Sequence, residues 1–157
     1  MPVREPVVLE FSEQHRAPVV ERMVAMAAAG TGWVNLSPGL DVDEPPPRSL
    51  LSSLVGGRGP TVPMATWTTP QGRRPAQVGV EHGQGPRALE VLAERGVPLP
   101  PGWQRVQDHA KRGIVVVPPP ATTADALDEV LGWMLRAAGA LCPLPRTGEW
   151  RAYCYGG

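Results

Sequence analysis

The sequence predicts an α+β fold, with a mixed β-sheet covered by about three helices in a two-layer sandwich. Two observations lead to this prediction. Apolar and β-branched stretches of strand length outnumber the segments with helical periodicity. Residues 76–109 also have the order strand, helix, strand, which predicts one β-α-β unit with parallel strands. Residues 1–157 fit a single domain, large enough to bury roughly 70% of its unfolded surface.

Two short strands and a helix are expected near the N-terminus. Residues 6–11 and 33–36 have the composition of strands. Between them, Pro18 suits the first turn of a helix, apolar residues follow at helical spacing, and Gly30 ends it. Residues 37–60 form a long loop rich in proline and glycine. Because this loop buries little apolar area, we expect it to be the most mobile part of the chain.

A hairpin and a short helix are expected in the middle of the chain. Residues 61–69 and 76–82 are rich in strand-forming side chains and are separated by a turn sequence. The helix at residues 87–95 is the most clearly marked element, because Pro86 stands at its first position and Gly96 follows its end.

The C-terminal part predicts a second hairpin, a long helix and a last strand. Residues 103–109 and 113–117 are the strands of the hairpin. Thr122 or Thr123 begins the long helix, whose apolar residues line one face as far as Leu141. Residues 150–155 form the last strand.

Five tryptophans and two cysteines lie in or beside these elements, and we expect them to pack in the core. The tryptophans outnumber the single phenylalanine, which is unusual for a surface that stacks ligands. Neither Cys142 nor Cys154 belongs to a C-x-x-C pair or has a histidine at ligand spacing, so both read as small buried side chains. The tryptophans are Trp33, Trp67, Trp103, Trp133 and Trp150.

The overall composition excludes several classes of partner. Fifteen basic and fifteen acidic residues cancel, so the chain lacks the positive field that binds nucleic acid. The N-terminus has no secretion signal, and no apolar run is long enough to span a membrane. A cytoplasmic location is therefore expected. All but one of the basic residues are arginine, which, with the abundant alanine, glycine and proline, is typical of GC-rich bacterial coding.

Polar residues are expected to meet at one edge of the sheet. If the strands of the β-α-β unit run parallel, their C-terminal ends share an edge, where α/β proteins commonly bind ligands. The first strand would bring Glu81 and His82 to this edge, and the second would bring Asp108 and His109. Side chains alternate along a strand, so His82 follows the apolar valines inward while Glu81 faces away.

The turn before the central helix is a candidate anion site. Free backbone N–H groups at a helix N-terminus attract anions, and Gly83, Gln84 and Gly85 lead into such a helix. Lys111 and Arg112 from the neighbouring hairpin would add positive charge, and arginine suits a carboxylate or phosphate best. The turn lacks a full dinucleotide fingerprint, so a simple helix start is the competing interpretation.

The best functional hypothesis is a non-catalytic module that binds a protein partner or a small molecule. The alternative is a small enzyme that uses His82 or His109 as a general base beside an anion at the glycine turn. No metal site or cofactor motif is predicted. Gly132 and Gly139 nearly share a face of the last helix, which suggests close approach of another element or of a second copy in a homo-oligomer.

Overall fold

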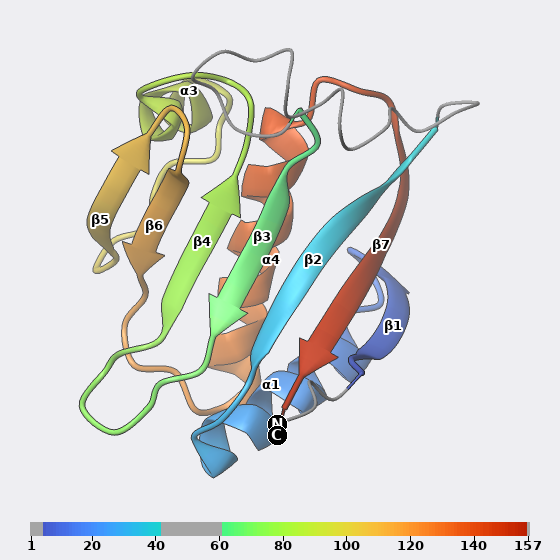
Figure 1. The fold of residues 1–157 in the computed structure, drawn as a ribbon, viewed down its shortest axis with the longest axis vertical. Helices are drawn as coiled ribbons and strands as arrows, with labels where there is room; N and C mark the ends of the chain where they lie inside the picture. Colours follow the sequence, from blue (N-terminus) through green and yellow to red (C-terminus); the bar gives the residue numbers. More distant parts are fainter. Residues whose placement is uncertain (1–4, 42–60, 157) are drawn as a thin grey trace.

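A computed structural model describes residues 5–41 and 61–156 of the protein, in which three helices accompany one seven-stranded sheet (Figure 1). None of these helices combines the length and apolar character needed to cross a membrane. The elements are β1 (Val7–Ser12), α1 (Ala17–Ala29), β2 (Trp33–Leu40), β3 (Met64–Thr68), β4 (Gln77–Glu81), α3 (Ala88–Glu94), β5 (Gln104–His109), β6 (Gly113–Val117), α4 (Ala124–Leu141) and β7 (Arg146–Tyr155).

The sheet confirms the α+β class but not the predicted mixed sheet. The strand order is β1-β7-β2-β3-β4-β6-β5, and every neighbouring pair is antiparallel. The strands β4 and β5 of the expected β-α-β unit do run in the same direction, because each is antiparallel to β6. However, β6 folds back through a short turn and lies between them. A tight hairpin therefore replaces the expected parallel pairing.

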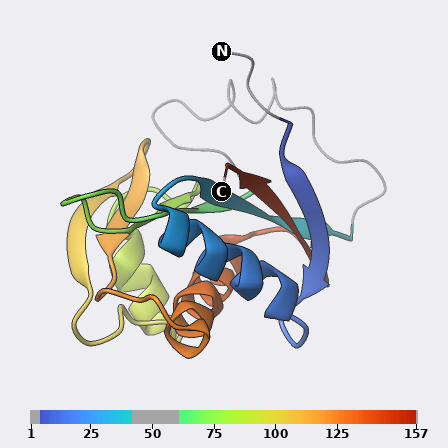
Figure 2. The same cartoon turned by 90° about the horizontal axis from the view of Figure 1, so that it is seen from below.

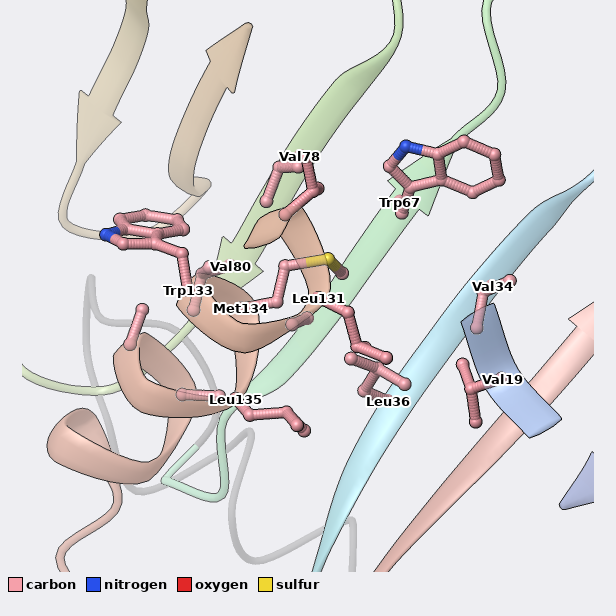
Figure 3. Close-up of a cluster of buried hydrophobic side chains, with 14 of the residues drawn as sticks. Val19, Val34, Leu36, Trp67, Val78, Val80, Leu131, Trp133, Met134 and Leu135 are labelled. Carbon is pink, nitrogen blue, oxygen red and sulfur yellow. The ribbon is translucent and has the colours of Figure 1, made fainter. Parts of the chain in front are cut away.

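The helices lie together on one face of the sheet (Figure 2). The long helix α4 contacts α1, α3 and the central strands β2, β3 and β4. Side chains on its inner face, such as Leu131 and Met134, pack toward Leu36 and Val80 of the sheet (Figure 3). The alternate residues of each strand point to the other face of the sheet, where the cavity described below is found.

The predicted helix ends agree closely with the structure. Gly30 closes α1 in a left-handed conformation, with φ 70° and its N–H bonded to the carbonyl of Met26. After α3, Gly96 has φ 81°, and the next N–H, of Val97, donates to the carbonyl of Leu92 at 2.8 Å. At the start of α4, the Thr123 hydroxyl accepts the N–H of Ala126 at 3.2 Å.

The start of α3 differs from its prediction. The helix begins at Ala88, after Arg87 adopts a left-handed backbone with φ 59°, and not at Pro86.

Strands β2 and β7 are both longer than predicted. Residues 37–40 belong to β2 and not to a loop, and β7 begins at Arg146, four residues earlier than expected. The two strands pair with each other, and β7 also pairs with β1, so hydrogen bonding on both sides extends it. Of the predicted loop at residues 37–60, residues 42–60 lie outside the described part of the chain.

Most of the predicted core residues are buried, but Trp33 is not. Trp67, Trp133 and Trp150 are each 1% exposed, whereas Trp33 is 42% exposed and stacks on Tyr155 with ring centroids 5.0 Å apart. These two residues are directly opposite each other on β2 and β7, on the face of the sheet away from the helices. Core packing was therefore the wrong expectation for Trp33.

Arginines of the same chain lie over both glycines of α4. A Cβ atom on Gly132 would be 2.8 Å from Nη1 of Arg16, and one on Gly139 would be 2.9 Å from Cζ of Arg146. Arg16 is held in place by two hydrogen bonds to the carboxylate of Asp128, at 2.9 and 2.8 Å. The two glycines thus leave room for these guanidinium groups on the surface of the helix.

Candidate functional site

The predicted histidine site lies on the helix side of the sheet, at the end of β4. His82 is 0% exposed, while the preceding Glu81 is exposed on the opposite face, as the alternation of the strand predicts. The N–H of Gln84 donates to Nδ1 of His82 at 3.1 Å. The side-chain amide of Gln84 donates in turn to the carbonyl of Leu141 at 3.2 Å, which links the glycine turn to the end of α4.

This hydrogen bond fixes the protonation of the imidazole. Because Nδ1 of His82 accepts the Gln84 N–H, the proton of the neutral ring is on Nε2. Burial lowers the pKa of His82 below its usual value of 6.5, and the negative charge of Asp108 opposes that shift with a smaller effect. Nε2 is buried and has no hydrogen-bond partner among the described residues.

The side chain of Asp108, on β5, forms hydrogen bonds with the backbone of the first turn of α3. Its Oδ1 accepts the N–H of Ala88 and its Oδ2 accepts the N–H of Leu89, each at 3.0 Å. These are the backbone donors that a free helix N-terminus would offer to an anion. A carboxylate of the chain's own β5 therefore binds at this helix end.

The remaining predicted residues lie at the tip of the β5–β6 hairpin. Nδ1 of His109 accepts the N–H groups of Lys111 and Arg112, at 3.0 and 3.1 Å, so this histidine stabilises the turn. The side chains of both basic residues are exposed. Hydrogen bonds thus join Gln84 to His82 and join Lys111 and Arg112 to His109. Within the described residues, no group of three or more His, Cys, Asp or Glu side chains could hold a metal ion.

A cavity of about 720 Å³, which the sequence did not predict, lies on the face of the sheet opposite the helices and His82. It lies over β1, β7 and β2, where Glu10, Arg151 and Tyr153 alternate with core residues and so face away from the helices. Its lining combines apolar and hydroxyl-bearing side chains with three charged ones. The lining residues are Glu10, Ser37, Pro38, Gly39, Leu40, Val62, Thr147, Glu149, Trp150, Arg151 and Tyr153.

An irregularity in the pairing of β2 with β7 shapes this cavity. The register shifts between Pro38 and Leu40, so that Gly39 alone lies opposite three residues of β7, Thr147 to Glu149. A Cβ atom on Gly39 would be 2.6 Å from Oγ1 of Thr147 and 2.9 Å from the carbonyl oxygen of Glu149. Gly39 therefore permits close contact with the bulge, and bulges often occur beside functional sites.

Little in the sequence could have indicated this cavity. The charged and aromatic residues of β7 follow an alternating pattern, which predicts that Glu149, Arg151 and Tyr153 share a face. Their meeting with Glu10 and Ser37 depends on the pairing of β7 between β1 and β2. Strand order of this kind has no local signal.

Comparisons with known proteins gave no match: no protein-family model, no curated protein and no solved structure is matched by this chain.

Proposed function

We propose that this protein is a non-catalytic module that binds a small organic molecule in the cavity on the face of its sheet opposite the three described helices. The observation that carries the proposal is the cavity itself. Its volume of about 720 Å³ is within the range of about 300–1,000 Å³ that is usual for ligand sites. Ligand sites combine apolar surface, which supplies affinity, with polar groups that orient the ligand, and both kinds of side chain line this cavity.

The composition of the lining agrees with this role. Leu40 and Val62 contribute apolar surface, Tyr153 contributes an aromatic ring, and Ser37 and Thr147 contribute hydroxyl groups. Four of these groups come from β2 and β7, so the sheet holds them in position, and Val62 belongs to the segment that precedes β3. A site on neighbouring strands needs little ordering when a ligand binds, which favours affinity.

The enzyme hypothesis, with His82 or His109 as a general base, receives less support. His82 is fully buried, and Nδ1 of each histidine already accepts backbone N–H groups. A general base needs an accessible lone pair within hydrogen-bond reach of its substrate. Catalysis by either residue would therefore require the loss of these bonds.

Protein-observed NMR of the amide signals during titration with a library of small organic fragments tests the proposal. We expect several fragments to bind the native protein and to shift the backbone amide signals of Ser37, Arg151 and Tyr153. The variant Ser37→Trp should abolish this binding because the indole fills the cavity. Gln77→Trp is the matched control, since Gln77 is exposed on β4 and does not line the cavity. The proposal is wrong if no fragment binds, or if Ser37→Trp binds the same fragments as the control.

A further inference from the structure

The charged residues that line the cavity over β1, β2 and β7 indicate which kind of molecule it selects. Three charged side chains line it: Glu10, Glu149 and Arg151. Glu10 and Arg151 are directly opposite each other on β1 and β7, and Nε of Arg151 is 3.5 Å from the carboxylate of Glu10. Arg151 is the one positively charged residue among the described residues of the lining, and Glu10 is its ion-pair partner.

Glu149 provides the remaining charge. Within the described parts of the chain it belongs to no ion pair. Its backbone N–H donates to Oγ1 of Thr147 at 3.1 Å, and its carbonyl oxygen would be 2.9 Å from a Cβ atom on Gly39. The bulge therefore holds the backbone of Glu149 in place at the cavity, and the described residues of the lining carry a net charge of one carboxylate.

The neighbouring side chains suit a cation with an apolar body. Tyr153 is on the same face of β7 as Glu149 but roughly 13 Å further along the strand, so its ring can contact the body of a ligand whose ammonium group is at Glu149. Leu40 and Val62 offer apolar contact for the rest of the molecule. A carboxylate at one end of a lining that also offers apolar and aromatic surface is complementary to an organic amine.

We propose that the cavity selects organic amines that carry a positive charge, with Glu149 as the carboxylate that binds the ammonium group. This inference rests on the proposed function, because it requires the cavity to bind a ligand. It adds the chemical class of that ligand. Anions of the same size should bind poorly, because the carboxylate of Glu149 would repel them.

Three probes with a similar body test the inference: phenethylamine, which is cationic at neutral pH, phenylethanol, which is neutral, and phenylpropionate, which is anionic. Amide chemical shifts of the native protein, followed during titration at low ionic strength, give the three dissociation constants. We expect the amine to bind about tenfold more tightly than the alcohol, as one charge-assisted hydrogen bond would produce. The anion should bind more weakly than either.

The variant Glu149→Gln should remove the preference for the amine while the alcohol binds as before. Glu81→Gln is the matched control, because Glu81 is an exposed glutamate on the same face of the sheet and does not line the cavity. It should keep the full preference. Unchanged amide spectra outside the cavity show that both variants are folded.

Two outcomes overturn the inference separately from the proposed function. If the alcohol or the anion binds as tightly as the amine, the cavity binds ligands without selecting cations. If Glu149→Gln keeps the preference for the amine, another group is responsible for it. If none of the three probes and no member of the fragment library binds, the proposed function fails as well.

Discussion

The carboxylate of Asp108 on β5 forms a hydrogen bond with the backbone N–H of Ala88, the first residue of α3, at 3.0 Å. Its second oxygen binds the next N–H, of Leu89, at the same distance. Asp108 and Ala88 are twenty positions apart in the sequence. One side chain thus caps a helix and attaches the β5–β6 hairpin to it.

Replacement of Asp108 by alanine should lower the free energy of unfolding by about 2 kcal/mol, the upper end of the effect of losing a helix cap. The two N–H groups would lose a charged acceptor, and α3 would lose a negative charge at its N-terminus. Urea denaturation of the variant measures this change. Glu94→Ala at the exposed end of the same helix is the control and should change stability by less than about 0.5 kcal/mol. Equal effects of the two substitutions would contradict the capping role.

The buried imidazole of His82 should make stability depend on pH. The pKa of His82 in the folded protein is below its value of 6.5 in the unfolded chain. Between these two values the unfolded chain binds a proton that the folded protein does not, so stability falls as the pH drops below about 6.5. The fall ends once the pH is below the folded pKa. Denaturation midpoints measured from neutral to acidic pH give this dependence.

The variant His82→Asn isolates the contribution of this residue. The asparagine oxygen can accept the Gln84 N–H without titrating, so the dependence on pH below 6.5 should become weaker. His15→Gln is the control, because His15 is exposed, and it should retain the native dependence. A pH profile that is identical in the native protein and in His82→Asn would show that other groups cause it.

The two glycines of α4 should respond differently to alanine. Alanine is favoured over glycine in a helix by about 1 kcal/mol. At Gly139 the three atoms nearest to the new methyl group all belong to the guanidinium of Arg146, whose contacts with Glu13 at 3.8 Å and with the Trp150 ring at 5.9 Å are long, so we expect it to move aside. Gly139→Ala should therefore raise the free energy of unfolding.

At Gly132 the stabilisation that alanine gives to the helix should be cancelled. The methyl group would displace Arg16 from its two hydrogen bonds with Asp128. The combination Arg16→Ala with Gly132→Ala should recover the stabilisation, relative to Arg16→Ala alone. Thermal denaturation of the variants provides the comparison. If Gly132→Ala is as stabilising as Gly139→Ala, the arginine contact is not what the glycine serves.

Gly39→Ala should destabilise the sheet and alter the cavity. The added methyl group would be 2.6 Å from Thr147 Oγ1 and 2.9 Å from a backbone oxygen of Glu149, so β2 and β7 must separate. Overpacking of this kind costs about 1–3 kcal/mol. Gly79→Ala in β4 is the matched control, because the nearest atom to its methyl group, the carbonyl oxygen of Ile114, would be 3.7 Å away. Chemical denaturation should find Gly79→Ala near neutral, and a similar loss in both variants would refute the close contact at Gly39.

The sequence alone determined the elements that depend on neighbouring residues. The end of α1 at Gly30 and the start of α4 at Thr123 were predictable, because helix caps depend on a few adjacent residues. The inward orientation of His82 was also predictable, since it follows from the alternation of a single strand. That Gly83, Gln84 and Gly85 bind an anion remains a prediction.

Only the tertiary structure decided which strands are neighbours. The sequence pattern of β6 is compatible with either side of β5, and its place beside β4 made the sheet antiparallel throughout. Long-range strand pairing also brought Asp108 to α3, and it placed Glu10 of β1 beside Arg151 of β7 at the cavity. Hydrogen bonds between strands involve backbone groups that every residue carries, so the side-chain pattern of one strand does not specify its partner.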